Sequence, residues 1–370
     1  MKKTIQLILW VLIVGAVLFY GYEWWNSFPK VSFAPPLVSH SKKEKLDSIL
    51  IATLNQNQLS GLAVSVVRNS KVTYQKAIGF NELESKDSFK TNTILPVASI
   101  SKIFTSLAVA KHFQSVGLNV ADPISILQHP LISPESDLGK ISFEELLRHE
   151  SGLKDKTVFN EFFKQKKDQS LDNYVLDFLE GSPKLGRKRE YHYADINFDL
   201  LGFLLSFSSG ASFDQLVQES VFRQLGMKSS YFNESLIIDG GYRKTPVWKR
   251  LKESPIEYQS HPSPSSGLQS SVEDLNNALL QLIRLHLGNM QEELLWLQTD
   301  PEKAPAGFQK IEINKQQFIG HFGGQAGFSA LLLFDPEEKF GLIILSNTRD
   351  RDNFRVNLAS EIHSLIQQNP

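Results

Sequence analysis

The 370-residue chain contains no cysteine, which excludes disulfide bonds, thiolate metal sites and a cysteine nucleophile. It also lacks an excess of charge, because 39 basic side chains stand against 40 acidic ones. Nucleic-acid binding depends on clustered Lys and Arg, and no basic block is present, so we predict no nucleic-acid partner. A composition of 41% hydrophobic residues with 25 Phe excludes a wholly disordered chain. Any chemistry must therefore come from Ser, His, Lys, Tyr and carboxylates.

One long uncharged run occurs at the N-terminus. Lys2 and Lys3 precede Thr4–Tyr22, which is apolar and close to the ~20 residues that cross a bilayer as a helix. The leading lysines predict a cytoplasmic N-terminus, with everything after Glu23 outside the cytoplasm, periplasmic or at the cell surface. We interpret residues 1–25 as an uncleaved single-pass membrane anchor. A cleaved signal peptide is the alternative, but no small-x-small cleavage site follows the run.

The remaining sequence predicts a tether followed by one α+β domain. Residues 26–41 contain three prolines and are expected to form an extended tether, and residues 42–370 form the domain. Strands at both ends of this domain, with a mostly helical region at roughly 105–300 between them, predict a sheet that joins strands distant in the chain. Hydrophobic spacing predicts helices at Lys42–Asn57, Ser99–Val116 and Phe354–Ile366, and strands at Leu62–Val67, Val72–Ile78, Ser329–Phe334 and Gly341–Leu345.

An S-x-x-K pattern stands at the start of the second predicted helix, at Ser99-Ile100-Ser101-Lys102. The i, i+3 spacing places the hydroxyl and the ammonium on one helix face, and the helix N-terminus favours negative charge on the serine. A partly desolvated Lys102 could accept the serine proton. Taken alone the pattern is weak, because Ser39–Lys42 matches it inside the tether. An ordinary helix cap with a solvated lysine explains it equally well.

Four further motifs follow in order, and together they resemble a known family. The motifs are Ile141–Leu153, Tyr193–Gly202, Ser265–Leu275 and Gly320–Phe328. With the S-x-x-K pattern they resemble the serine β-lactamase-like hydrolases, which include class C β-lactamases, D-alanyl-D-alanine carboxypeptidases and their esterase and D-aminopeptidase relatives. The resemblance covers about residues 46–365. It implies a β-lactamase/transpeptidase-like α+β fold, with an antiparallel sheet flanked by helices and a mostly helical subdomain, preceded here by one transmembrane helix.

The resemblance also implies catalytic roles for individual residues. It assigns Ser99 as the nucleophile and Lys102 as its proton acceptor. Tyr193 matches the tyrosine that works with this lysine as general base and then protonates the leaving group, although an ordinary aromatic residue in a Tyr-rich turn is the alternative. The backbone N–H groups of Ser99 and Gly324 would form the oxyanion hole.

Three further positions are implied in substrate binding, and two of them depart from the family pattern. Gly323 lets a strand approach the substrate closely. Asp195 stands where many members have Asn, so it can accept from Lys102 but cannot donate to the substrate, and it could hold the lysine protonated. His321 replaces the lysine of the usual Lys-Thr-Gly motif, so we expect it to bind a substrate carboxylate in a pH-dependent way. A structural role is the alternative for His321, and His149 is predicted to be structural.

The sequence therefore predicts a membrane-tethered serine hydrolase that acts through a serine acyl-enzyme on an amide or ester. The substrate would be a small molecule or peptide, such as a D-amino peptide of cell-wall type, a β-lactam-like compound or a short ester. No metal or cofactor is predicted, because the nine His show no His-x-x-x-His pair and no phosphate-binding Gly loop occurs. The alternative is a catalytically silent sensor or scaffold that binds cell-wall peptides in the same cleft, which Asp195 and His321 would favour.

Overall fold

The computed structural model describes residues 2–34, 41–155, 170–183, 185–186, 190–232, 237–257, 263–284 and 290–368. At its centre is a seven-stranded antiparallel sheet with the strand order β11-β12-β13-β14-β1-β2-β3. Its strands are β1 (Gly61–Arg68), β2 (Lys71–Glu82), β3 (Asp87–Ser88), β11 (Gln309–Ile313), β12 (Gln316–Gln325), β13 (Phe328–Asp335) and β14 (Phe340–Ser346). Pairing of β1 with β14 joins chain-distant strands, so the predicted α+β architecture is confirmed.

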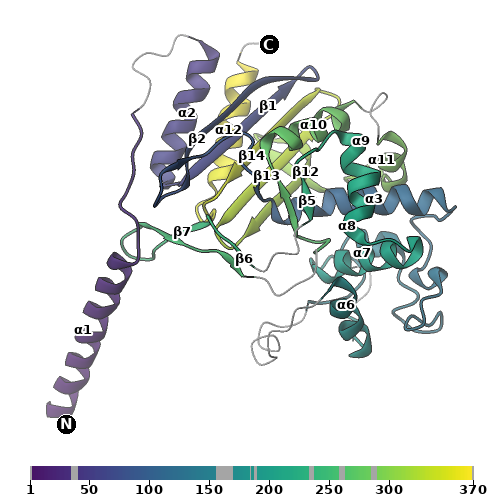
Figure 1. Ribbon diagram of the computed structural model, residues 1–370, viewed down its shortest axis with the longest axis horizontal. Coiled ribbons are helices and arrows are strands. Elements are labelled where there is room, and N and C mark those ends of the chain that lie inside the picture. Colours follow the sequence, from purple (N-terminus) through teal and green to yellow (C-terminus); the bar gives the residue numbers. More distant parts are fainter. Residues whose placement is uncertain are drawn as a thin grey trace.

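Strand β1 is buried on both faces because helices cover both sides of the sheet. Its alternate residues Leu62, Val64 and Val66 pack in one core cluster with helices α2 (Lys42–Asn57) and α12 (Phe354–Gln367). The intervening Ala63 and Val67 point into the larger core on the other face, toward the helical region. This period-two alternation follows from the pleat of the strand. Figure 1 shows α2 and α12 together on one side of the sheet.

The other face carries the mostly helical region, which also contains short strands that the sequence did not indicate. Its helices are α3 (Ser101–Ser115), α4 (Phe143–Leu147), α6 (Leu171–Glu180), α7 (Ile196–Ser209), α8 (Phe213–Val217), α9 (Arg223–Leu225), α10 (Val272–Ile283) and α11 (Gln291–Leu297), with the turns η1 (Ala98–Ile100), η2 (Ile124–Leu127) and η3 (Gln218–Phe222). The short strands are β4 (Leu95–Pro96), β5 (Tyr231–Phe232), β6 (Ile237–Ile238), β7 (Tyr242–Lys244), β8 (Leu251–Glu253), β9 (Ile256–Glu257) and β10 (Leu268–Ser270).

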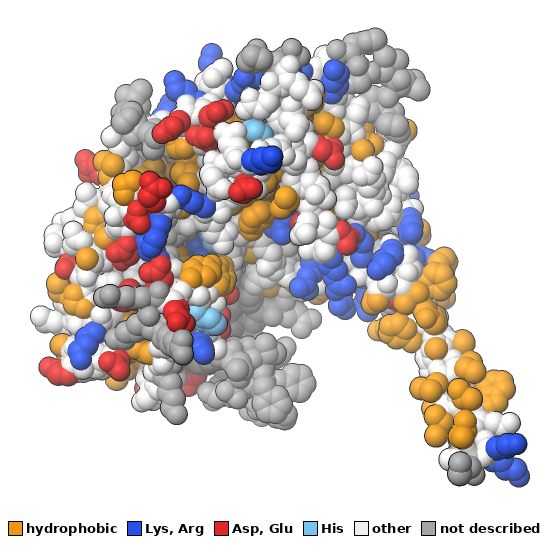
Figure 2. Space-filling model, turned by 180° about the vertical axis from the view of Figure 1, so that it is seen from behind, with side chains coloured by type: hydrophobic (Ala, Val, Ile, Leu, Met, Phe, Trp, Pro, Cys, Tyr) orange, Lys and Arg blue, Asp and Glu red, His pale blue; other side chains and the backbone are white. Residues whose placement is uncertain are grey.

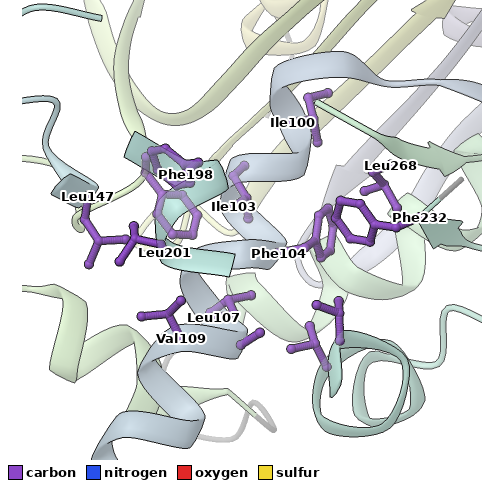
Figure 3. Close-up of a cluster of buried hydrophobic side chains, with 14 of the residues drawn as sticks. Ile100, Ile103, Phe104, Leu107, Val109, Leu147, Phe198, Leu201, Phe232 and Leu268 are labelled. Carbon is purple, nitrogen blue, oxygen red and sulfur yellow. The ribbon is translucent and has the colours of Figure 1, made fainter. Parts of the chain in front are cut away.

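Helix α3 runs through the middle of this core. Figure 3 shows Ile103, Phe104 and Leu107 of α3 among apolar side chains from α4, α7, β5 and β10. A helix surrounded on all sides by apolar side chains is held in one position, and α3 begins directly after the turn that carries Ser99. The predicted helix at Ser99–Val116 is therefore a short 3₁₀ turn followed by an α-helix.

The N-terminal helix α1 (Lys2–Trp25) is long and apolar enough to cross a membrane, and it projects away from the domain (Figure 1). The residues after it lie against the domain. The Phe28 N–H donates to Leu251 O at 2.8 Å, and the Asn55 side chain pairs with the N–H and C=O of Phe33 at 2.9 and 2.8 Å. The described part of the predicted tether at 26–41 is thus fastened to the domain, while residues 35–40 lie outside the described residues.

Strand β12 passes very close to turn η1. A Cβ placed on Gly323 would lie 2.0 Å from Val97 O, whereas a Cβ on the neighbouring Gly324 would meet no atom within 4 Å. Only a residue without a side chain fits at position 323, because the backbone carbonyl of Val97 cannot move independently of the turn. This close approach holds the end of β12 beside Ser99.

We expect Gly323→Ala to destabilise the domain by about 1–3 kcal/mol, the usual cost of overpacking a close contact. Gly324→Ala is the matched control, because its added methyl group enters open space and should leave the melting temperature unchanged. Differential scanning fluorimetry of both variants checks this. Equal melting temperatures for Gly323→Ala and the wild type would show that β12 can shift freely away from the turn.

Candidate active site

Ser99 is partly exposed on turn η1, and the residue before it has an unusual backbone conformation. Ala98 has φ 48°, in the left-handed region that costs a residue with a Cβ free energy. The neighbouring Ser101 stabilises this turn, because its hydroxyl donates to Ala98 O at 2.6 Å and accepts from the Leu268 N–H at 2.9 Å. The buried side chains of Ile100 and Leu268 lie beneath it (Figure 3). The turn therefore presents Ser99 in a fixed position at the protein surface.

Lys102 is fully buried, and its ammonium lies beside the Ser99 hydroxyl. Lys102 Nζ donates to Asp195 Oδ1 at 2.7 Å, to Ser265 O at 2.9 Å and to Ser99 Oγ at 3.4 Å. It also lies 4.8 Å from the centre of the Tyr193 ring. These contacts use the three N–H donors of an ammonium group. The structure thus brings together four of the predicted site residues, Ser99, Lys102, Tyr193 and Asp195.

The charge of Lys102 is stabilised by its partners. Burial by itself lowers the pKa of Lys102, but the negative charge of Asp195 and the Tyr193 oxygen outweigh burial, so that the pKa is raised above its ordinary value. Lys102 is therefore an ammonium at neutral pH. A protonated lysine cannot accept the Ser99 proton, so this geometry favours Tyr193 as the base and Lys102 as a fixed positive charge.

Tyr193 is placed for proton exchange with Ser99. Its hydroxyl lies 2.8 Å from Ser99 Oγ, closer than the Lys102 ammonium does. The ring packs on the imidazole of His149, with ring centres 4.4 Å apart. His149 Nδ1 accepts from the Ala194 N–H at 3.3 Å and from Asn197 Nδ2 at 3.1 Å. His149 therefore supports the segment that carries Tyr193, as its predicted structural role requires.

Asp195 precedes α7, and a second carboxylate holds the start of that helix. Asp155 accepts from the N–H groups of Asp195 and Ile196 at 3.1 and 2.9 Å. Burial is the main cause that raises the pKa of Asp155. The Asp195 side chain remains 46% exposed, which leaves it accessible to a substrate as well as to Lys102. Sequence reasoning missed Asp155, because no pattern in the sequence connects it with a helix 40 residues later.

Sequence reasoning also missed how the Ser265 motif participates. The Ser265 carbonyl accepts from Lys102, and the Ser265 N–H donates to Asp199 Oδ1 at 3.0 Å. Thr105 of α3 donates to Pro264 O at 2.7 Å. The buried side chains of Asp199 and Thr105 therefore fix the loop whose carbonyl accepts a hydrogen bond from Lys102. The order of motifs in the sequence indicated that the Ser265 segment belongs to the site. It could not indicate the contact with Lys102, because the acceptor is a backbone carbonyl oxygen, which every residue has.

His321 differs from expectation in its charge. It is only 2% exposed, and burial, followed by repulsion from Lys102, lowers its pKa to about 3. Its Nδ1 lies 2.6 Å from Phe322 O and must donate to that carbonyl, so the neutral ring offers only an acceptor at Nε2. The predicted imidazolium for a substrate carboxylate is therefore not formed at neutral pH. With a pKa of about 3, His321 changes its charge well below neutral pH, so the predicted pH dependence of binding through His321 is not expected near neutrality.

A cavity of about 410 Å³ adjoins the site on the β12 side. His321 and His149 line it together with residues of the 302–310 segment. His321 also lies close to Tyr193, with ring centres 6.4 Å apart. The cavity therefore lies beside Tyr193, and His321 is the residue by which strand β12 lines it. Substrate binding by Asp195, His321 and Gly323 stays a prediction.

A buried lysine between a serine, a tyrosine and a carboxylate, on an antiparallel sheet with a helical region, is the arrangement that the resemblance in the sequence implied. Residues 46–365 match the family described as Beta-lactamase, and the chain belongs to this family. The resemblance seen in the sequence is confirmed.

Individual relatives are distant in sequence. The chain is 23% identical over 328 residues to "Protein flp" of Staphylococcus aureus (strain MW2), covering 84% of this chain and 64% of that protein. It is 22% identical to "Beta-lactamase" of Pseudomonas fluorescens over 88% of this chain and 99% of that protein. The D-amino acid amidase of Ochrobactrum anthropi SV3 has the same fold, with a TM-score of 0.73, 16% identity, and coverage of 88% of this chain and all (100%) of that one.

Two of the buried histidines, His149 and His321, predict acid sensitivity. Burial is the main cause that lowers the pKa of both His149 and His321 to about 3. Below about pH 6.5 the unfolded chain binds protons that the folded chain does not, so stability falls as the pH falls toward 3. Each histidine should cost about 2 kcal/mol between pH 7.5 and pH 5, at about 1.4 kcal/mol per pH unit below 6.5.

Urea unfolding at pH 7.5 and pH 5 measures this loss. We expect His149→Asn and His321→Asn each to lose less stability on acidification than the wild type, whatever their stability at pH 7.5. His192→Asn, which removes an exposed histidine, is the control and should match the wild type. If all four proteins respond alike to pH, the two buried rings are protonated in the folded state.

Removal of the Asp195 charge should change the proton affinity of Lys102. Asp195→Asn removes the largest influence that raises the pKa of Lys102 and leaves burial, which lowers it. Lys102 then loses its proton at lower pH. A neutral Lys102 can itself accept the Ser99 proton, which the charged lysine of the wild type cannot, so the rate at which a fluorophosphonate labels Ser99 should rise at a lower pH in the variant than in the wild type. Glu337→Gln makes the same charge change on the distant β13–β14 turn and should keep the wild-type dependence of labelling rate on pH. If Asp195→Asn also keeps that dependence, the ion pair between Asp195 and Lys102 is contradicted.

Proposed function

We propose that this chain is a membrane-tethered serine hydrolase that forms an acyl-enzyme at Ser99 and acts on an amide or ester outside the cytoplasm. The observation that supports this most directly is the position of Ser99 Oγ, 2.8 Å from the Tyr193 hydroxyl and 3.4 Å from the Lys102 ammonium. A proton acceptor and a positive charge at these distances are what activation of a serine requires.

In the proposed reaction, Tyr193 starts as a phenolate, which the neighbouring Lys102 ammonium stabilises. Ser99 Oγ attacks the substrate carbonyl carbon while its proton passes to the Tyr193 oxygen. The N–H groups of Ser99 and Gly324 bind the oxyanion of the tetrahedral intermediate. The intermediate then expels the amine or alcohol, which takes the proton from Tyr193 and leaves Ser99 acylated. Water attacks the ester and gives a proton to Tyr193, and the second intermediate expels Ser99 Oγ, which takes that proton back as the acid is released.

Neutral His321 bears on the choice of substrate. Because it carries no charge at neutral pH, strand β12 offers no cation there for a substrate carboxylate. This favours a D-amino amide or a short ester over a β-lactam or a peptide whose free carboxylate needs a positive partner. The names of the similar proteins include both a β-lactamase and a D-amino acid amidase, so both classes belong in a turnover screen.

A second function has one specific observation in its favour. The ion pair between Lys102 and Asp195 keeps the lysine protonated, which would suit a catalytically silent sensor or scaffold that binds cell-wall peptides in the same cleft. Such a protein has no need for a reactive serine. Covalent labelling therefore separates the two functions directly.

We expect the full chain to be labelled by a fluorophosphonate probe, and Ser99→Ala to abolish labelling with a melting temperature close to that of the wild type, because the removed hydroxyl is partly exposed and is the most distant of the three acceptors of Lys102, so that water can replace it. Ser101→Ala is a poor control, since its hydroxyl stabilises the turn. Ser88→Ala, at an exposed position on β3, is the matched serine variant and should be labelled like the wild type. An unlabelled wild type would support the sensor, and labelling of Ser99→Ala would refute the nucleophile.

The same probe reports the location of the domain. A membrane-impermeant fluorophosphonate added to intact cells should label the chain, because the domain after α1 faces outward in the proposed topology. Labelling only after lysis would place the domain in the cytoplasm without affecting the assignment of Ser99.

A further inference from the structure

The β7–β8 hairpin, residues 242–253, lies at the point where α1 meets the domain (Figure 1). It forms a two-stranded sheet of its own, separate from the central sheet. Its tip is Pro246-Val247-Trp248, between strands β7 and β8. No motif in the sequence assigned this segment a role. Its contacts with α1 indicate one.

The hairpin tip is fitted to the end of α1. Glu23, the only buried residue among those described in α1, accepts from the N–H groups of Val247 and Trp248 at 3.2 Å each. Trp248 Nε1 donates to Tyr20 O at 3.1 Å, and its ring meets the Trp24 ring edge-on at 5.1 Å between centres. A buried carboxylate must be hydrogen-bonded to be tolerated, so these contacts fix the helix end to the hairpin.

Arg250 joins the same helix end to strand β8. Its guanidinium lies 4.0 Å from the centre of the Trp24 ring. It also donates to Phe28 O at 2.9 Å and to Ser27 O at 2.8 Å. A cation–π contact and two charge-assisted hydrogen bonds therefore hold the chain where it leaves the helix.

The base of the hairpin is fixed to the central seven-stranded sheet, which is the catalytic sheet in the sense that its strand β12 lies beside Ser99. Tyr242 is buried, its hydroxyl accepts from the Leu83 N–H at 2.9 Å, and its own N–H donates to Asn347 O at 2.9 Å. Gly327, in the turn between β12 and β13, packs so closely on Tyr242 N that a Cβ there would lie 2.2 Å away. Rigid contacts thus connect the end of α1 with the turn that follows Gly324.

The outer surface of the hairpin is apolar at its tip and basic beside it. Val247 and Trp248 are 42% and 40% exposed, although they are large apolar side chains. The segment Tyr242–Lys252 contains basic residues at 243, 244, 249, 250 and 252 and no acidic one. Arg243, Lys249 and the nearby Lys30 are exposed. Figure 2 shows Lys and Arg side chains gathered on the domain where the apolar helix joins it.

We propose that the β7–β8 hairpin is a second membrane-contact element, which places Val247 and Trp248 in the bilayer interface and Arg243, Lys249 and Lys30 against anionic phospholipid headgroups. This inference rests on the membrane span of α1 in the proposed function. Because the hairpin is fixed to both α1 and the catalytic sheet, it holds the active site in one orientation above the bilayer.

Three features favour a lipid surface as the occupant. The apolar surface of α1 continues directly into the exposed hairpin tip, since Trp248 packs on Tyr20 and Trp24. Tryptophan and tyrosine prefer the membrane–water interface, and this group of rings stands where the apolar helix ends. Basic side chains next to a span are attracted by anionic headgroups. The apolar hairpin tip therefore matches the boundary of the acyl chains in one leaflet. The basic rim, formed by Arg243, Lys249 and Lys30, matches the headgroup layer of the same leaflet.

The absence of cysteine from the sequence permits a direct test. The full chain with Val247→Cys, labelled with an environment-sensitive fluorophore, is placed in nanodiscs of phosphatidylcholine with phosphatidylglycerol. We expect blue-shifted emission that is quenched by acyl-brominated lipids. Glu337→Cys, on the distant β13–β14 turn, is the control and should report water without quenching. Equal, water-like emission from both positions would overturn the proposal.

Charge variants test the basic rim. Quenching at position 247 should fall in a triple variant that combines Arg243→Gln, Lys249→Gln and Lys30→Gln. It should also fall when the unchanged basic residues face discs of phosphatidylcholine alone. The matched triple Lys71→Gln, Lys140→Gln and Lys339→Gln, at exposed positions elsewhere, should not reduce the quenching. If millimolar inorganic phosphate reproduces the effect of anionic lipid, the rim is a phosphate site. If the introduced cysteines of two copies cross-link in detergent, the tip is a dimer contact. Either result overturns the proposal.

The same samples separate this inference from the proposed function. Fluorophosphonate labelling of Ser99 reports the hydrolase, and resistance to carbonate extraction from native membranes reports the span of α1. An unlabelled Ser99 with a quenched fluorophore at position 247 would refute only the hydrolase. A labelled, membrane-embedded protein with water-like emission from position 247 would refute only the hairpin contact.

Discussion

The buried ammonium of Lys102 is the constraint on which the site depends. A lysine removed from water is costly unless every donor is satisfied, and here three elements provide the acceptors. Ser99 comes from the turn before α3, Asp195 from the start of α7, and the Ser265 carbonyl from the loop before β10. Each of these elements is packed in the large core on one face of the sheet. The site and the helical region therefore stabilise one another.

The ion pair also determines how protons can move. In a site where the lysine is the base, its positive charge must be absent before the reaction. Asp195 reverses this requirement by keeping Lys102 charged, and Tyr193 becomes the remaining proton acceptor within reach of Ser99. Burial acts in the opposite sense on His321 and His149, which have no anionic partner in these contacts and stay neutral. The site thus combines one fixed cation with two neutral rings.

The connection from α1 through the β7–β8 hairpin to the β12–β13 turn gives the protein a defined geometry. With α1 in a membrane, as we propose, a flexible tether would let the domain rotate above the bilayer and approach substrates from any direction. Contacts of Glu23, Trp24 and Phe28 with the hairpin restrict that freedom. A substrate attached to a surface at a fixed distance from the bilayer would meet the cleft more often from a fixed domain than from a freely rotating one.

Local patterns in the sequence predicted several of the long elements and the candidate residues, but not the short strands β4 to β10. Apolar spacing predicted α2 at its observed bounds, and it predicted the cores of β13, β14 and α12, because burial on a sheet or helix face imposes a short-range period. The order of motifs identified Ser99, Lys102 and Tyr193. Tertiary structure alone decided which groups surround them. Asp155 and the Ser265 carbonyl lie far from Lys102 in the chain. The charge states of Lys102 and His321 follow from burial and from distant partners, which are Asp195, 93 residues away, for Lys102, and Lys102 itself for His321. Electrostatic environment is a property of the folded arrangement, so no short-range pattern in the sequence could specify it.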